Sequence, residues 1–362
     1  MTLPPRVAVR LHLTNVTGAG ATQLLQSLLP ALERDQKAVV ECIYLPDRGP
    51  LADYVSLSSA TLVEVFRRRL PRALSRVLEC TLFAYQFNGD TPLIVLGDLP
   101  LRCNSSQIVF VQQSNLLRPK RFRWRKGGLR YWLARVIFAI NHTRVRAFIV
   151  QTDVMRIALE RMFPDIAGRV YVISQPVPTW LLYSGLKRSG RVKKDGGKLK
   201  LVYPAADYPH KNHILLSRIP THADCPVEEL ILTINSLSNP ASHLSWVRCS
   251  GFLSPEEMIK MYSEVDALLF MSKEESYGFP LVEAMFVGVP IICPDLEYAR
   301  VLCGSEAIYF DPNDATSLVS AIQCLNSRLE LGWWPHWEDR LIHFPPDWET
   351  VAERMLQVVR DA

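Results

Sequence analysis

The sequence predicts an α/β protein built of two parallel-sheet domains, and three observations carry this prediction. The chain has 362 residues, enough for two domains of ordinary size. Along both halves, short apolar runs of strand length alternate with segments of helical periodicity, which is typical of βαβ units. A basic, glycine-containing stretch over 184–198 has the composition of a flexible linker. We therefore expect one domain over 1–183 and a second over 199–347, facing one cleft.

In the first half, apolar runs such as Ile108 to Val111 have the composition of buried parallel strands. Gly18 and Gly20 form a turn before the first helix, which is an anion site in principle, but for a lone Gly-x-Gly a plain tight turn is the favoured interpretation. Gln113 and Asn115 follow the strand at 107–112; their amides can hydrogen-bond a sugar but cannot act as a general base. The expected strands are 7–14, 39–44, 91–97, 107–112, 147–151 and 170–173, and the expected helices are 21–32, 61–78 and 153–162, the last capped by Asp153.

The most basic stretch runs from 118 to 135 and contains eight Arg and Lys residues but no Asp or Glu. Aromatic residues are interleaved with these charges, a composition that suits an anionic membrane surface carrying a lipid-linked acceptor. A solvated loop and helix is the other interpretation, and binding of nucleic acid through the same charges is disfavoured. The candidates for membrane contact are Arg121, Arg123, Trp124, Arg125 and Lys126.

In the second half, Ser254 and Pro255 form a helix start, Pro280 suits the first position of another helix, and Gly288 suits its end. The tryptophans at 333, 334, 337 and 348 are expected to pack the terminal crossing rather than to bind sugar. The expected strands are 199–203, 228–233, 246–247, 267–271, 291–293 and 308–312 with its turn, and the expected helices are 254–263, 280–287, 314–325 and 348–359.

The strongest functional signal is the stretch 272–294, SKEESYGFPLVEAMFVGVPIICP. It joins a buried strand to a helix, and a loop at the carboxyl end of a strand is the usual ligand position in α/β folds. The backbone N–H groups of residues 277–279 approach a helix N-terminus and favour an anion. Glu275 and Glu283 bracket this cradle with hydrogen-bond acceptors. A nucleotide sugar needs that pairing, whereas a solvated loop carboxylate and a dipole-favoured helix start would explain the two residues without a ligand.

The Glu-x7-Glu spacing, with Gly-Phe-Pro-Leu-x-Glu-Ala-Met inside it, resembles the donor site of retaining GT-B glycosyltransferases of family 4, the glycosyl transferases group 1. The resemblance implies two Rossmann-like domains facing a cleft, with the terminal helix at 348–362 crossing back to the first domain. It implies that Glu275 contacts sugar hydroxyls, Glu283 binds the ribose and Lys211 neutralises the donor pyrophosphate. The implied donor-binding residues are Gly18, Gly20, Lys211, Gly251, Phe252, Glu275, Ser276, Tyr277, Gly278, Phe279 and Glu283; Glu275 and Lys211 are the implied catalytic pair, and Gln113 and Asn115 are the acceptor-side candidates.

The chain departs from the family pattern at two positions. No histidine follows the strand at 107–112, and Ala206 stands where an arginine is common, five residues before Lys211. Lys273 or a basic residue of the first domain would then supply the missing charge. These departures motivate a second hypothesis, a catalytically weak GT-B protein that binds sugar or lipid and serves a complex.

The resemblance implies a retaining hexosyltransferase that uses a GDP- or UDP-linked sugar and a saccharide acceptor, expected to be lipid-linked, in synthesis of O-antigen or lipopolysaccharide type. Because the sequence has no Asp-x-Asp motif, neither a metal nor another cofactor is expected. The eight cysteines form no Cys-x-x-Cys pair, which favours buried thiols in a reducing compartment. The N-terminus has no signal-peptide pattern and no apolar run is long enough to span a bilayer, so we expect a cytoplasmic protein, peripheral at the inner face of the membrane.

Overall fold

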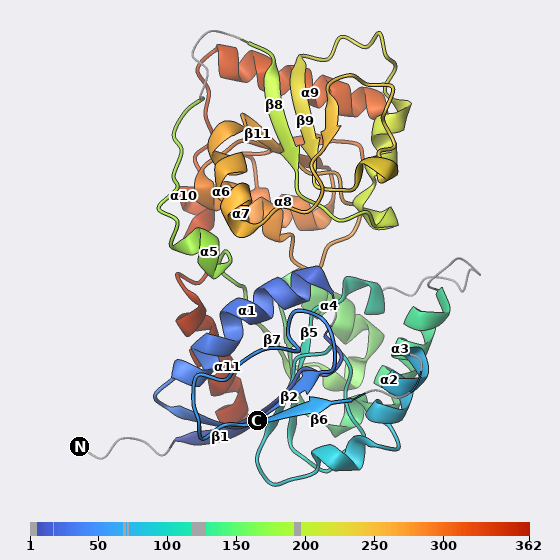
Figure 1. Ribbon diagram of the computed structural model, residues 1–362, viewed down its shortest axis with the longest axis vertical. Helices are drawn as coiled ribbons and strands as arrows, with labels where there is room; N and C mark the ends of the chain where they lie inside the picture. Colours follow the sequence, from blue (N-terminus) through green and yellow to red (C-terminus); the bar gives the residue numbers. More distant parts are fainter. Residues whose placement is uncertain (1–5, 17, 68–69, 71, 118–127, 192–196) are drawn as a thin grey trace. The chain divides into compact units, whose positions relative to one another are not determined.

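The computed structural model divides the chain into two compact units (Figure 1). Unit 1 is Met1–Gln175 together with Pro345–Ala362, and unit 2 is Pro176–Phe344. The division therefore comes before the stretch 184–198 that the sequence marked as a linker. The residues whose structure is described are 6–16, 18–67, 70, 72–117, 128–191 and 197–362.

Unit 1 is built on a seven-stranded parallel sheet of order β3-β2-β1-β4-β5-β6-β7. Its central strands are apolar because helices cover both faces of the sheet. Helices α1 and α11 lie together on one face, and α2 and α3 on the other (Figure 1). The strands are β1 (Val7–His12), β2 (Ala38–Pro46), β3 (Leu62–Phe66), β4 (Leu93–Val95), β5 (Gln107–Val111), β6 (Val145–Val150) and β7 (Val170–Val172), and the helices are α1 (Ala19–Arg34), α2 (Arg72–Cys80), α3 (Gly128–Asn141), α4 (Asp153–Met162) and α11 (Trp348–Asp361).

The terminal helix α11 belongs to unit 1 although it follows unit 2 in the sequence. It packs against α1 with the apolar face that includes Val351, Met355 and Leu356. At the surface, Nζ of Lys37 lies 2.5 Å from Oε1 of Glu353. The expected return of this helix to the first domain is therefore confirmed.

Two local predictions in unit 1 are wrong. Residues 61–78 are not one helix, because Leu62–Phe66 forms edge strand β3, paired in parallel with β2. The β-branched side chains of Val63 and Val65 favour a strand, and the pairing partner lies too far away in the sequence for local periodicity to reveal it. In α4 the cap is Thr152, whose side chain accepts a hydrogen bond from the backbone of Met155 at 3.3 Å.

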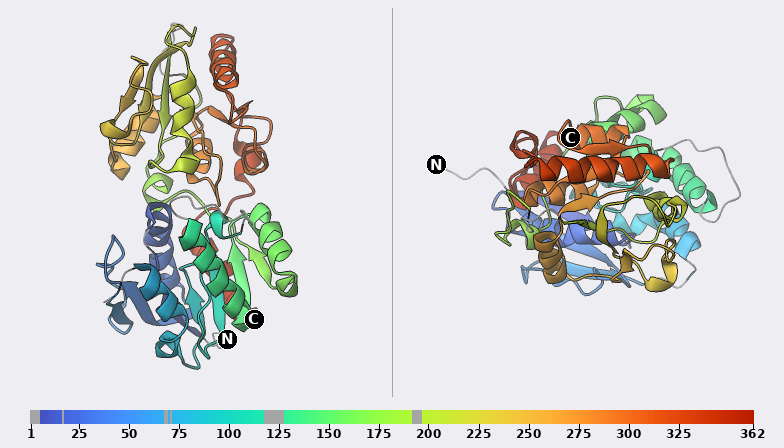
Figure 2. Two further views of the ribbon diagram at one scale, coloured as in Figure 1. Left: turned by 90° about the vertical axis from the view of Figure 1, so that its right-hand side faces the viewer. Right: turned by 90° about the horizontal axis from the view of Figure 1, so that it is seen from above.

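Unit 2 is built on a six-stranded parallel sheet of order β10-β9-β8-β11-β12-β13. Helices lie on both faces of this sheet as well (Figure 2). The strands are β8 (Leu199–Tyr203), β9 (Val227–Leu232), β10 (Val247–Cys249), β11 (Ala267–Leu269), β12 (Ile291–Pro294) and β13 (Ile308–Phe310), and the helices are α5 (Thr179–Leu182), α6 (Pro255–Glu264), α7 (Phe279–Val287), α8 (Glu297–Cys303), α9 (Ala315–Glu330) and α10 (Glu338–Leu341). Two parallel-sheet units confirm the predicted fold class.

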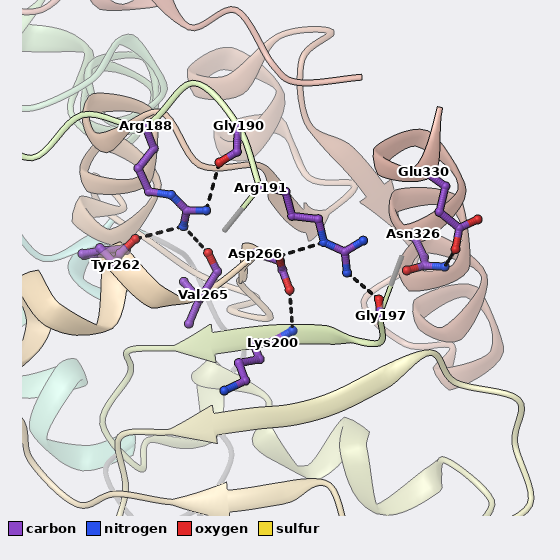
Figure 3. Close-up of polar contacts among 10 residues, drawn as sticks. All are labelled: Arg188, Gly190, Arg191, Gly197, Lys200, Tyr262, Val265, Asp266, Asn326 and Glu330. Carbon is purple, nitrogen blue, oxygen red and sulfur yellow. Dashed lines mark hydrogen bonds and ion pairs between the residues drawn. The ribbon is translucent and has the colours of Figure 1, made fainter. Parts of the chain in front are cut away.

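The described part of the expected linker is bound to unit 2 rather than free (Figure 3). The guanidinium of Arg188 donates to the carbonyl oxygens of Tyr262, at 3.1 Å, and of Val265. Arg191 forms a largely buried ion pair with Asp266, with 3.0 Å between Nε and Oδ1. The basic residues that indicated a solvated linker thus find acceptors at the carboxyl end of α6, and the charge that helix carbonyls carry there favours cations.

The prediction that the four tryptophans pack the terminal crossing is wrong for three of them, because Trp333, Trp334 and Trp337 pack within the core of unit 2. Trp334 donates its indole N–H to the carbonyl oxygen of Gly288 at 2.7 Å, and Trp337 donates to that of Val289 at 3.0 Å. Trp348 is buried where α11 begins. All eight cysteines are free thiols, and Cys324 alone among them is exposed. Among the described residues, none of the helices combines the length and apolar character needed to cross a bilayer.

Candidate functional site

The candidate site in unit 2 begins at the loop between β11 and α7. Gly278 caps α7 in the left-handed backbone region, with φ of 91°, which favours glycine. A Cβ at this position would come within 3.3 Å of Cδ1 of Leu281. Phe279 is the first helical residue and Pro280 the second, so the predicted helix start is one residue late. The first helical hydrogen bond runs from the N–H of Leu281 to the carbonyl oxygen of Gly278 at 2.9 Å, so the backbone N–H groups of Gly278 and Phe279 precede it and can bind an anion.

Lys211 and Glu275, the two predicted catalytic residues, lie in contact. Nζ of Lys211 is 2.5 Å from Oε1 of Glu275, and their side chains are 16% and 12% exposed. They meet because Lys211 follows β8 and Glu275 follows β11, and these parallel strands are neighbours whose carboxyl ends share one edge of the sheet. The backbone N–H of Lys273 donates to the carbonyl oxygen of His210 at 2.7 Å and fastens the two loops together.

Two buried tyrosines fix the backbone of both loops through hydrogen bonds. The hydroxyl of Tyr203 donates to the carbonyl oxygen of Lys211 at 2.7 Å, and that of Tyr298 donates to the carbonyl oxygen of Ser272 at 2.5 Å. Asn212 adopts the left-handed conformation with φ of 60°, and its amide donates to the carbonyl oxygen of Pro312 at 2.9 Å. The site residues are therefore positioned by hydrogen bonds from buried side chains to the backbone of their loops.

Glu283 lies one helical turn into α7 and is buried, with 4% of its surface exposed. The hydroxyl of Tyr262, from α6, donates to its Oε2 at 2.9 Å. Burial raises the pKa of Glu283 to about 7, while the hydrogen bond from Tyr262 acts in the opposite direction. The carboxyl group thus titrates near neutral pH, unlike a solvated glutamate. Its contact with a ribose stays a prediction.

The remaining donor candidates of unit 2 occupy two loops. Gly251 follows β10 with φ of 76°, and its N–H donates to the carbonyl oxygen of Ile234 at 3.0 Å. Phe252 beside it is 88% exposed, so its ring is available to a ligand. Tyr277 is buried against Phe279, with ring centroids 5.0 Å apart. Tyr277 can therefore serve a ligand through its backbone only. The neighbouring residue Ser276 is half-buried.

The candidates of unit 1 lie on separate elements. Gly18 is the N-cap of α1 and Gly20 is its second residue, so the helix starts earlier than the sequence indicated. Gln113 is half-buried after β5, and Asn115 lies in the short 3₁₀ turn Ser114–Leu116. The predicted membrane contacts Arg121, Arg123, Trp124, Arg125 and Lys126 lie outside the described residues.

Sequence reasoning missed a buried polar cluster at the carboxyl end of β1. Nε2 of His12 lies 3.2 Å from Oε1 of Glu79 in α2, and both side chains are fully buried. The hydroxyl of Thr14 donates to the same carboxylate oxygen, and the amide of Asn15 donates to it at 3.3 Å. The cluster anchors the loop that leads to α1. Its one sequence signal is His12 at the end of β1, a strand whose other polar residue is Arg10.

Within the described residues, no three His, Cys, Asp or Glu side chains are placed to hold a metal ion. Metal independence therefore stays an expectation drawn from the motif. The chemistry available in unit 2 is that of an anion-binding helix start, one lysine and two carboxylates, which together match a phosphorylated and hydroxylated ligand.

Comparison with known proteins places this site in a recognised segment. Residues 237–328 match the family model for Glycosyl transferases group 1. The chain is 29% identical to O-antigen chain mannosyltransferase B of Escherichia coli over 88 residues, 24% of this chain and 23% of that protein. It is 24% identical to O-antigen chain mannosyltransferase RfbU of Salmonella typhimurium over 151 residues, 40% of this chain and 43% of that protein. Each match thus spans less than half of the relative.

Solved structures match the whole chain. Sucrose-phosphate synthase of Thermosynechococcus elongatus matches with a TM-score of 0.68 and 16% identity, covering 98% of this chain and 99% of that one. WaaG, a glycosyltransferase involved in lipopolysaccharide biosynthesis, gives 0.64 and 14%, covering 98% and 100%. Anabaena HepE, in complex with UDP and glucose, gives 0.62 and 15%, covering 99% and 100%. At these identities the likeness establishes the fold, which is GT-B.

Proposed function

We propose that this chain, which has the GT-B fold and matches the Glycosyl transferases group 1 model over residues 237–328, is a glycosyltransferase of surface-polysaccharide synthesis. The observation that carries the proposal is the contact between Lys211 and Glu275. The contact brings a cation and a carboxylate, a group that can accept hydrogen bonds from hydroxyls, to one edge of the unit 2 sheet. The two partial relatives are O-antigen mannosyltransferases, which supports a role in O-antigen or lipopolysaccharide assembly.

The donor is a nucleotide sugar, linked to GDP or UDP. Lys211 and the N–H groups at the start of α7 bind its pyrophosphate, because both offer positive charge to an anion. Glu275 binds hydroxyls of the transferred hexose, and Glu283 binds the ribose. The UDP and glucose bound to HepE, a structural neighbour, support a donor of this class.

The transfer proceeds with retention of configuration and without a metal. The bond between the anomeric carbon and the phosphate oxygen breaks, and the acceptor hydroxyl oxygen forms the new bond on the same face. The proton of that hydroxyl passes to the leaving phosphate. Lys211 stabilises the charge on the leaving group. This route requires no protein base, in keeping with the neutral amide of Gln113 after β5.

The acceptor is a saccharide carried on a lipid. The basic and aromatic residues between 118 and 135 support contact with an anionic membrane, because cations are attracted to its surface and aromatic rings favour its interface. The enzyme then works at the inner face of the cytoplasmic membrane, where nucleotide sugars are available.

A second candidate function is a GT-B protein that binds sugar or lipid with weak catalysis. It is favoured by the pairing of Lys211 with Glu275, which offsets the charge of the lysine, and by Ala206 at the position where an arginine is common. Binding of nucleotide sugars without hydrolysis or transfer would support this alternative.

The test is a thermal-shift screen of GDP, UDP, ADP and their hexose conjugates, followed by product analysis of slow donor hydrolysis. A ligand at 100 times its Kd should stabilise unit 2 by about 2.7 kcal/mol. Glu275→Gln should abolish hydrolysis, whereas the exposed carboxylate variant Glu297→Gln serves as the matched control. A screen in which no nucleotide shifts the melting temperature would overturn the proposal.

A further inference from the structure

Unit 1 contains a cavity of about 470 Å³ at the carboxyl ends of β2 and β3. This volume falls within the range of roughly 300–1,000 Å³ that is usual for small-molecule sites. Tyr44 of β2, Phe66 of β3 and Phe87 line it, and α2 forms a wall. The cavity is distinct from the loop after β5 that carries Gln113 and Asn115, and the motifs of the sequence gave no indication of it.

The floor of the cavity is aromatic and held from behind. The ring of Phe87 lies edge-on to that of Tyr44 with 5.0 Å between centroids, and 6.0 Å from that of Phe66. His12 packs edge-on against the other side of Phe87 at 4.5 Å and is itself bound to Glu79. Tyr44 and Phe87 are buried, so the floor keeps its shape without a ligand.

The rim of the cavity carries polar side chains beside the exposed apolar side chains of Leu70 and Phe83. Glu64, Arg67 and Gln86 line it and are exposed. Within the part of the chain that the structure describes, none of these three side chains forms a hydrogen bond or an ion pair. A carboxylate, a guanidinium and an amide together accept and donate, so they can satisfy several hydroxyl groups. Among the described residues of the rim, the charges of Glu64 and Arg67 offset each other, which favours a neutral ligand over a phosphate.

We propose that this cavity binds a pyranose ring of the saccharide acceptor, an inference that rests on the proposed function. A pyranose presents C–H groups on its faces, which suit the more accessible rings of Phe66 and Phe83 above the aromatic floor. Its hydroxyl groups lie at the edge, where the rim offers both donors and acceptors. An alkyl chain would leave the polar side chains of the rim without partners, and among the described lining residues a pyrophosphate would meet the guanidinium of Arg67 together with the carboxylate of Glu64.

The test is saturation-transfer NMR of the full chain with the methyl pyranosides of mannose, glucose and galactose. At least one should bind saturably to the wild type, and Glu64→Gln should weaken its binding about tenfold, as the loss of one charged hydrogen bond implies. Gln86→Ala should weaken it as well. Both residues are exposed, so the fold should survive. Asp53→Asn, another exposed carboxylate change in unit 1, should leave binding unchanged.

Donor hydrolysis, measured in the same samples, separates this inference from the proposed function. It should be equal in the wild type and Glu64→Gln, since Glu64 lies outside the donor machinery. If hydrolysis occurs but no pyranoside binds, or Glu64→Gln and Asp53→Asn bind alike, the sugar site is overturned. Preferential binding of decyl phosphate would also overturn it. If pyranoside binding depends on Glu64 but no nucleotide sugar binds or reacts, the proposed function fails instead.

Discussion

Nζ of Lys211 lies 2.5 Å from Oε1 of Glu275, although 64 positions separate the two residues in the sequence. Before any donor binds, each charge therefore has a partner. A bound pyrophosphate would compete with Glu275 for the lysine, and a bound sugar would compete with Lys211 for the carboxylate. A donor would therefore separate the two side chains, with its pyrophosphate on Lys211 and its sugar on Glu275.

Glu275→Gln should lower turnover strongly while leaving the affinity for bare GDP or UDP unchanged or increased. The amide no longer holds the lysine by charge, so Lys211 is free for the diphosphate, but the sugar loses a charged hydrogen bond worth roughly 1.5–3 kcal/mol. Calorimetric titration and single-turnover transfer measure the two effects. Equal losses of affinity for the sugar-bearing and bare nucleotides would contradict the assigned role, and Glu297→Gln is the control.

Glu283→Gln should remove a pH-dependent penalty on stability. Burial raises the pKa of Glu283 from 4.5 to about 7, so the folded state holds its proton more tightly than the unfolded state. The contribution of the protonated Glu283 side chain to the free energy of unfolding is fully present below pH 4.5 and is lost as pH rises through about 7. At about 1.4 kcal/mol per pKa unit, this loss is about 3 kcal/mol. Urea unfolding at pH 5 and pH 8 should show a smaller fall for the variant than for the wild type. An unchanged fall would disprove the assignment of this pKa.

Tyr262→Phe should move the pH midpoint of nucleotide binding upward. The hydroxyl of Tyr262 favours the charged form of Glu283, so its loss raises the pKa of that carboxyl group further. If the carboxylate binds the ribose, affinity for GDP or UDP should decline below about pH 7 in the wild type and at higher pH in the variant. Tyr309→Phe removes a hydroxyl that donates to the carbonyl oxygen of Gly304 and serves as the control. Identical midpoints in all three proteins would exclude this role for Tyr262.

Gly288→Ala should destabilise unit 2 by more than about 2 kcal/mol. Gly288 ends α7 with φ of 93°, and a Cβ there would overlap the carbonyl oxygen of Arg188. Gly332 has a similar φ of 79° with no atom within 4 Å of the added Cβ, so Gly332→Ala should cost only the left-handed strain, about 1–2 kcal/mol. Urea unfolding of both variants isolates the overlap. Equal losses of stability would show that residues 184–191 are not packed as described.

Changing Arg121, Arg123, Arg125 and Lys126 to Ser should remove roughly 4 kcal/mol of affinity for anionic membranes, if each cation contributes about 1 kcal/mol. Binding should also fall with ionic strength, because the surface potential acts within a Debye length of about 8 Å at physiological salt. Co-sedimentation with anionic and neutral vesicles measures both effects, with donor hydrolysis as the control. Equal partitioning to the anionic and neutral vesicles would contradict membrane contact and favour the interpretation of 118–135 as a solvated loop and helix.

The sequence predicted the fold wherever the signal is local. Pro280 and Gly288 bracket α7 in the sequence as they do in the structure, and Ser254 caps α6 with Glu257 in a capping box. Strand β3 was not predicted, because Leu62–Phe66 is stabilised by its pairing with β2 rather than by a local signal. An edge strand with exposed side chains has no periodic apolar face to report its position.

The motif around Glu275 and Glu283 and the position of Lys211 pointed to residues that the structure brings to one edge of the unit 2 sheet. Their binding of a donor stays a prediction. Their partners depend on the packing of distant elements, so nothing local indicates that Tyr262 binds Glu283. The family pattern places a histidine after β5 and so did not indicate His12 of β1, whose partner Glu79 lies on α2.

The place of α11 in unit 1 has a consequence for how the chain is made. A ribosome releases unit 1 without its last helix and then the whole of unit 2 before Trp348–Asp361 emerges. Until then α1, which packs against α11 in the complete protein, lacks part of its cover. The first unit therefore stays incomplete during synthesis until the second unit has been made. A chain that ended at Gln175 would be an aggregation-prone fragment rather than a complete native domain.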